Sequence, residues 1–133
     1  MENQLEDLRA HVGKKFPSAT FEATSLSSGG MLISISGVPL REGWNRPSAK
    51  VIFVQPPGYP GAAPDCFWVE PAGLRLTSGG TPQNTNDANA IPADPQPGRS
   101  TTWFSWHVRA WNPSSDRLVD FFQLILTRLH PAR

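Results

Sequence analysis

The proline-rich segment at residues 56–64, with the sequence PPGYPGAAP, restricts the fold of this chain more than any other feature. A proline fixes its own φ angle and has no backbone N–H, so four prolines in these nine residues exclude a helix and an interior strand. Regular structure must therefore end before this segment and start again after it. At 133 residues the chain has the size of one domain, and we expect a single domain over residues 1–133.

Before the proline-rich segment, the sequence predicts one helix and three strands. Leu5, Leu8 and Val12 recur at helical spacing, which indicates an amphipathic helix over residues 3–15. Apolar runs then predict strands, and the Ser-Ser-Gly-Gly sequence after the first of them is typical of a hairpin turn. Because short links join these strands, we expect an antiparallel meander. The predicted strands cover residues 19–26, 31–36 and 49–55.

After the proline-rich segment, the sequence predicts a fourth strand, a long loop and a final helix. The apolar run at residues 66–69 is long enough for one strand. Residues 77–102 contain seven Gly or Pro and one large apolar residue, Ile91, which is typical of a long functional loop. Residues 112–116 then supply a helix cap, and an apolar stripe at helical spacing follows. The stripe consists of Leu118, Phe121, Phe122, Ile125 and Leu129.

These elements define an α+β fold. We expect an N-terminal helix, a four-stranded antiparallel meander, a long loop and a C-terminal helix packed on the sheet. The final helix is expected to lie on the sheet because its apolar stripe is wide enough to cover one.

The composition excludes several classes of function. A net charge of +1 with no strongly basic block argues against nucleic acid as the main partner. The longest apolar run is shorter than the ~20 residues of a membrane helix, and the acidic N-terminus is not a secretory signal, so we expect a cytoplasmic protein without a membrane partner. Cys66 is the single cysteine and the three histidines are scattered, so we expect no internal disulfide and no dedicated metal site.

Several short motifs resemble those of ubiquitin-conjugating enzymes. The Tyr-Pro-Gly-Ala-Ala-Pro sequence at residues 59–64 resembles the Tyr-Pro-x-x-Pro-Pro segment that links the third and fourth strands in that family. The Trp-Asn-Pro sequence at residues 111–113 is similar to the Trp-Ser-Pro that follows the family's active site. The chain looks closest to divergent bacterial members of the superfamily. The segments that are similar to theirs are Pro-Pro-Gly-Tyr-Pro at 56–60, Phe-Trp-Val at 67–69, Gly-Gly-Thr-Pro at 79–82 and Trp-Phe-Ser-Trp-His at 103–107.

The sequence departs from that family at its catalytic residues. The family's catalytic cysteine lies a short way before the Trp-x-Pro, but residues 100–105 contain no cysteine. The His-Pro-Asn tripeptide, whose Asn assists the family's reaction, is also missing. Cys66 aligns with an apolar strand position of the family, and buried cysteines are unreactive. We therefore expect Cys66 to be a core residue and not the nucleophile.

Ser105 and His107 are the candidates to replace the missing nucleophile. On an extended segment, residues i and i+2 project from the same face, so the hydroxyl and the imidazole can approach each other. A serine becomes a good nucleophile when a neighbouring base takes its proton, and histidine is the usual base near neutral pH. Thr101 and Thr102 are competing hydroxyl nucleophiles. The alternative is that Ser105 and His107 only satisfy backbone groups beside the neighbouring tryptophans.

The resemblance implies a conjugating-enzyme-like acyltransferase of a bacterial ubiquitin-like modification pathway. In this hypothesis, an activating enzyme passes the C-terminal acyl group of a ubiquitin-like protein to a hydroxyl of this chain, as an oxyester, and the chain passes it to a target protein. No cofactor is needed for this step, because the family's ATP is consumed by the activating enzyme.

Two other functions stay open. A catalytically inactive variant would act as a binding module for a ubiquitin-like protein or an activating enzyme, and the missing Cys and Asn favour it. An unrelated serine hydrolase is the third hypothesis, although the sequence lacks a Gly-x-Ser-x-Gly motif. For partner binding the candidates are Trp44, as an exposed indole in a Gly-Trp-Asn-Arg-Pro loop, and Tyr59 of the Tyr-Pro segment.

Overall fold

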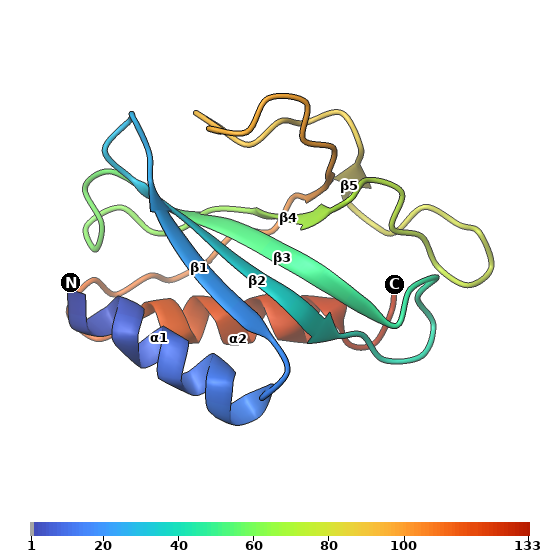
Figure 1. Cartoon of the computed structure of the whole chain (residues 1–133), viewed down its shortest axis with the longest axis horizontal. Coiled ribbons are helices and arrows are strands. Elements are labelled where there is room, and N and C mark those ends of the chain that lie inside the picture. The colour runs from blue at the N-terminus through green and yellow to red at the C-terminus, as the bar shows by residue number, and fades with distance from the viewer. Residues whose placement is uncertain (1) are drawn as a thin grey trace.

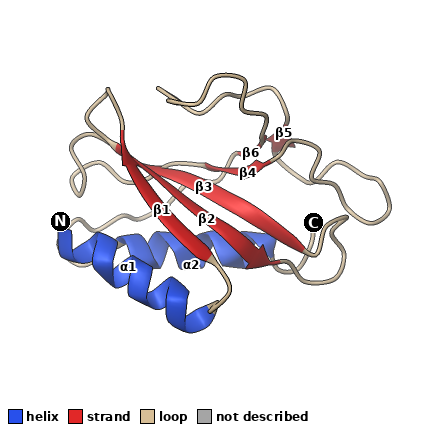
Figure 2. Cartoon of the chain, in the orientation of Figure 1, coloured by secondary structure: helices blue, strands red, loops and turns tan. Residues whose placement is uncertain are grey.

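The computed structural model describes residues 2–133 and consists of two helices against one antiparallel sheet (Figure 1, Figure 2). The strands form a six-stranded sheet in the order β1-β2-β3-β4-β6-β5, with every neighbouring pair antiparallel. The expected α+β class, with an N-terminal helix, an antiparallel sheet and a C-terminal helix, is confirmed. In chain order the elements are α1 (Glu2–Lys15), β1 (Thr20–Ser25), β2 (Met31–Pro39), β3 (Ser48–Gln55), β4 (Phe67–Glu70), β5 (Thr85–Asn86), β6 (Thr102–Phe104) and α2 (Leu118–Leu129).

Both helices lie on the same side of the sheet (Figure 1). In α1, Leu8 and Val12 are buried, as their spacing predicted. The whole predicted stripe of α2 is buried as well, and Phe121 lies with its ring centroid 5.2 Å from that of Phe53 in β3. Burying one such side chain stabilises a fold by about 1.5–3 kcal/mol, so these contacts hold the helices on the sheet. Among the described residues, neither helix has the length and hydropathy of a membrane-spanning segment.

The long loop lies on the side of the sheet opposite the helices (Figure 1). A second, smaller apolar cluster includes residues of the sheet and of this loop. Ile91 from the loop is part of this cluster. The indole N–H of Trp68 donates to the Asn89 carbonyl over 3.0 Å, and Arg99 forms an ion pair with Glu70 at 2.9 Å. These contacts fasten the loop across the sheet. The buried members of the cluster are Leu26, Leu32, Ile52, Cys66, Trp68 and Ile91.

The sheet has two strands more than the expected four-stranded meander. β6 pairs with β4 so that Phe104 lies opposite Phe67, with the two rings stacked at 4.5 Å. β5 lies within the stretch that we expected to be only loop, and it pairs with β6. Strands of two or three residues are too short to show an alternating pattern. Their long-range pairing partners decide that they form.

The start of α2 also differs from the expectation. The helix begins at Leu118 and not directly after Asn112. The Asn112 N–H donates to the Asp116 carboxylate over 2.7 Å, which closes a separate turn before the helix. Arg117 is the N-cap residue instead, and the carboxylate of Asp120 at position N3 accepts its N–H over 2.9 Å. Two capping patterns, one closed by Asp116 and one by Asp120, therefore follow each other in this sequence, and the second one starts the helix.

Candidate active site

The segment that follows β6 is held from both sides by backbone hydrogen bonds. On one side the Ser105 N–H donates to the Asn84 carbonyl over 2.9 Å. On the other side the Cys66 N–H donates to the Trp106 carbonyl over 2.9 Å. Asn84 and Cys66 have φ angles of 56° and 62°, in the left-handed region that non-glycine residues adopt uncommonly. The backbone around Ser105 is therefore fixed by two residues in unusual conformations.

Ser105, His107 and Asp65 form a hydrogen-bonded series of side chains, which we call the triad. Oγ of Ser105 lies 3.2 Å from Nε2 of His107, and Nδ1 of His107 lies 2.5 Å from Oδ1 of Asp65. We assign the ring proton to Nδ1, so that His107 donates to Asp65 and accepts the Ser105 hydroxyl proton at Nε2. The triad has the order of nucleophile, base and orienting carboxylate that acyl-transfer enzymes use. The closeness of Ser105 and His107, predicted from their spacing, is confirmed.

The triad lies on the surface of the protein. The side chains of His107 and Asp65 are 62% and 63% exposed. Water screens the attraction between such exposed groups, so Asp65 acts more by orienting the imidazole than by stabilising its charge. The exposure also leaves the imidazole accessible to a second macromolecule.

No pattern in the sequence identified Asp65 as a site residue. It lies 42 positions from His107, at the end of the proline-rich segment. No local pattern marks it, because a single Asp before a strand is common and its partner is distant in sequence. The one feature that could have identified Asp65 in the sequence is its position directly after the family-like Tyr-Pro segment.

Thr102, one of the competing nucleophiles, has a structural role. It is fully buried, and its Oγ1 accepts the backbone N–H groups of Gly73 and Leu74 over 3.0 and 3.2 Å. Its hydroxyl proton is donated to the Asp87 carboxylate over 2.7 Å. Thr101 is also buried, at 6% exposed. Neither threonine therefore offers an accessible hydroxyl comparable to that of Ser105.

Cys66 is buried, at 6% exposed, as expected for a core residue. It lies just before β4 and not inside it, because its positive φ interrupts the extended backbone. Burial raises the pKa of the thiol above its usual value, with hydrogen bonding by the Trp106 backbone acting in the opposite direction. The protein alone therefore favours the neutral thiol over the nucleophilic thiolate.

The exposed position expected for Trp44 is wrong. Trp44 is 4% exposed, and its indole N–H donates to the Leu129 carbonyl at the end of α2 over 2.8 Å. Its ring lies edge-on to Phe104, with 6.3 Å between centroids. A backbone bridge to Leu76 ties the loop of Trp44 to the segment after β4. The indole is thus part of the core.

Tyr59 is likewise buried, at 6% exposed. Its hydroxyl donates to Oε1 of Gln4, and burial raises the pKa of the phenol to about 12. The rings of Tyr59 and Trp111 lie 5.8 Å apart, and the Trp111 indole N–H donates to the Pro60 carbonyl over 2.8 Å. The Tyr-Pro and Trp-Asn-Pro segments, distant in sequence, therefore contact each other.

The fold and these contacts define a class of protein. The two helices, the antiparallel sheet and the family-like segments agree with the resemblance to ubiquitin-conjugating enzymes, which are also called E2 enzymes. The family match shows that the chain is a bacterial member of this E2 superfamily. It belongs to Prokaryotic E2 family E, whose family model matches residues 8–132. No curated protein and no solved structure matches the chain significantly.

Proposed function

We propose that this protein carries the acyl group of a ubiquitin-like protein in a bacterial, cytoplasmic modification pathway, and that Ser105 holds it as an oxyester. The donor is an activating enzyme and the acceptor is a target protein. The triad supports this proposal most directly, with 3.2 Å between Oγ of Ser105 and Nε2 of His107. Membership of a prokaryotic E2 family supports the reaction class.

Loading is an acyl transfer from a thioester to a hydroxyl. Oγ of Ser105 attacks the carbonyl carbon of the thioester that joins the ubiquitin-like C-terminus to the activating enzyme, and Nε2 of His107 takes the hydroxyl proton. The carbon–sulfur bond breaks, the thiol of the activating enzyme leaves with that proton, and an oxyester remains on Ser105. Asp65 accepts the Nδ1–H of His107 and so keeps Nε2 free to act as the base.

In the second step, the transfer of the acyl group from Ser105 to the target, the proton moves from His107 back to the Ser105 oxygen. An amine of the target attacks the oxyester carbonyl, an amide forms, and the Ser105 oxygen recovers a proton through His107. Donor and acceptor are both proteins in this reaction. The 62% exposed side chain of His107 is compatible with access by such large reactants.

A catalytically inactive binding module is the second candidate function. The single cysteine, Cys66, is 6% exposed and burial raises the pKa of its thiol. The usual thioester chemistry of the superfamily therefore has no accessible thiolate here. In this case the sheet and helices would bind a ubiquitin-like protein or an activating enzyme without accepting an acyl group.

Incubation with the cognate activating enzyme, ATP and the ubiquitin-like protein, followed by a denaturing gel, separates the two functions. We expect a covalent adduct that resists thiols and is cleaved by mild hydroxide or hydroxylamine. Ser105→Ala should abolish the adduct, while Ser114→Ala, at an exposed serine in the turn before α2, should keep it. An undiminished adduct in Ser105→Ala would contradict the role of Ser105. No adduct, with partner binding retained, would favour the binding module.

A further inference from the structure

The triad shares two of its side chains with a second group of potential ligands. The carboxylate of Asp65, the thiol of Cys66 and the imidazole of His107 have ligating atoms that all lie within 4.8 Å of one another. Zn²⁺ binds sulfur, nitrogen and oxygen ligands at about 2.0–2.3 Å, which places tetrahedral ligands about 3.3–3.8 Å apart. The three atoms are thus close to the separation that one metal ion needs. We propose that Asp65, Cys66 and His107 form a binding site for Zn²⁺ or a similar divalent transition metal ion.

The mixture of donor atoms selects the kind of metal. Mg²⁺ and Ca²⁺ prefer sets of oxygen ligands, whereas thiolate and imidazole ligands favour Zn²⁺ and its neighbours in the transition series. Three protein ligands leave a fourth tetrahedral position for water or another small ligand. The site therefore has the ligand number of an open zinc site and not that of a closed structural one.

The fold supplies one fixed ligand and two adjustable ones. Cys66 is 6% exposed, and its N–H bond to the Trp106 carbonyl holds it beside the segment of His107. Its positive φ of 62° takes it out of the line of β4. Asp65 and His107 are more than half exposed, so their side chains can rotate by the small amount that coordination requires. Cys66 and His107 are far apart in sequence, so no local spacing of ligands indicated a metal site.

Metal binding and acyl transfer exclude each other at this site. Nδ1 of His107 and Oδ1 of Asp65 lie 2.5 Å apart, with one proton between them, which is closer than two ligands of one ion approach. Coordination must therefore open this hydrogen bond and take away the geometry that makes His107 a base for Ser105. This consequence rests on the proposed function, whereas metal binding itself does not.

A titration of the tag-free protein with Co²⁺ tests the site without any pathway component. A cobalt–thiolate bond gives an ultraviolet charge-transfer band, and tetrahedral Co²⁺ gives strong visible bands. We expect both bands, saturation at one equivalent of metal and displacement of Co²⁺ by Zn²⁺. Absence of the charge-transfer band in the wild-type protein would overturn the proposal.

Two variants remove ligands and two matched variants serve as controls. Cys66→Ser should remove the charge-transfer band, and His107→Gln should weaken binding by more than about tenfold. The exposed position of His107 makes His107→Gln decisive even if Cys66→Ser fails to fold. Ser105→Ala and His130→Gln, at an exposed histidine after α2, should bind Co²⁺ like the wild type. Unchanged binding in His107→Gln would overturn the proposal.

The loading assay then separates this inference from the proposed function. Zn²⁺ should inhibit oxyester formation by the wild-type protein, and a chelator should restore it. Co²⁺ bands in a protein that never forms an adduct would support the metal site and contradict the acyl carrier. An adduct in a protein without Co²⁺ bands would support the acyl carrier and contradict the metal site.

Discussion

His107 donates to Asp65 across 42 positions of the sequence, with Nδ1 at 2.5 Å from Oδ1. This hydrogen bond joins the end of the proline-rich segment to the segment after β6. It sets the orientation of the imidazole whose other nitrogen faces Ser105. A carboxylate at this position converts a neighbouring serine and histidine into a triad.

Asp65→Asn tests whether the carboxylate orients His107. The amide can present its N–H₂ to Nδ1 and favour the wrong tautomer, so we expect oxyester formation to slow by about 10–100-fold. The effect should be smaller than for a buried carboxylate, because Asp65 is 63% exposed. Loading rates from quenched time courses measure it. Asp7→Asn, an exposed carboxylate on α1, is the control, and equal rates for both variants would contradict the role of Asp65.

Ser105→Cys should convert the adduct into one that thiols cleave. A thiol is a better nucleophile than a hydroxyl and depends less on a neighbouring base. His107→Ala should therefore slow loading of Ser105 by about 10²–10⁴-fold and slow loading of the Ser105→Cys protein by less. Parallel gels with and without a thiol reductant measure both effects. An adduct of Ser105→Cys that still resists thiols would place the acyl group on another residue.

Thr102→Val should destabilise the fold and leave loading in place. Valine has nearly the same shape, but the Leu74 N–H loses its acceptor and Asp87 loses a donor. The Gly73 N–H keeps only its longer hydrogen bond to Asp87, at 3.4 Å. Leaving buried polar groups unpaired costs about 1–3 kcal/mol of unfolding free energy. Urea unfolding measures this loss, with Thr127→Val on the exposed side of α2 as the control. A folded Thr102→Val protein without any adduct would make Thr102 the nucleophile.

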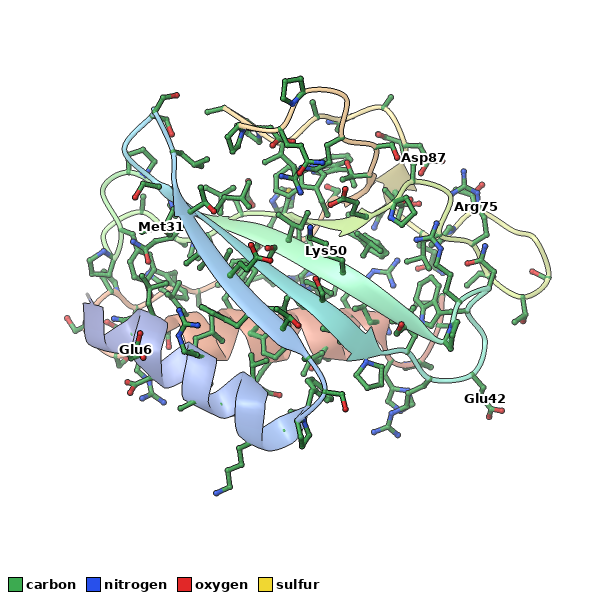
Figure 3. The ribbon with its side chains drawn as sticks, in the orientation of Figure 1. Glu6, Met31, Glu42, Lys50, Arg75 and Asp87 are labelled. Atoms are coloured by element: carbon green, nitrogen blue, oxygen red, sulfur yellow. The ribbon has the colours of Figure 1, made fainter. Side chains whose placement is uncertain are left out.

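Asp87 should make stability depend on pH in the acidic range. Arg75 binds the Asp87 carboxylate at 2.5 Å (Figure 3), and this hydrogen bond, with further help from Thr102, lowers the pKa of Asp87 from its usual 3.8. A carboxyl group with a lowered native pKa binds its proton more readily in the unfolded state. Its contribution is therefore complete above the unfolded pKa and is lost as the pH falls through the native pKa.

Asp87→Asn measures this contribution. We expect it to lower the unfolding free energy by about 1–2 kcal/mol at neutral pH, since the pair is about one-third exposed, and we expect this difference to shrink as the pH falls from the unfolded pKa through the lowered native pKa. Urea unfolding across that range is the measurement. Glu42→Gln, at an exposed carboxylate far from Asp87 in Figure 3, should show no such trend. A constant difference between wild type and Asp87→Asn at all pH values would contradict the linkage.

Local spacing predicted the elements whose signal lies within a few neighbouring residues. The stripe of Phe121, Phe122 and Ile125 predicted the buried face of α2, because helical period alone puts these side chains on one side. The closeness of Ser105 and His107 followed in the same way from extended backbone. The family-like motifs predicted the E2 superfamily, to which the chain belongs.

The predictions that were wrong or incomplete concern residues whose contacts come from distant segments. Trp44 was predicted to be exposed in its loop, but it is buried. Its indole N–H donates to the Leu129 carbonyl, and its ring packs against Phe104. β6 was not visible in the sequence because its three residues depend on pairing with β4. A segment of only a few residues carries no sign of which distant partner will cover it.

The sequence by itself determined the α+β class, the amphipathic faces of the helices and the pairing of a hydroxyl with an imidazole two residues away. The tertiary structure alone decided that Asp65 completes the triad and that Cys66 lies within 4.8 Å of the same side chains. The reason is physical. Periodicity reports which side a side chain faces, whereas the meeting of residues more than 40 positions apart depends on how the sheet brings the strand ends together.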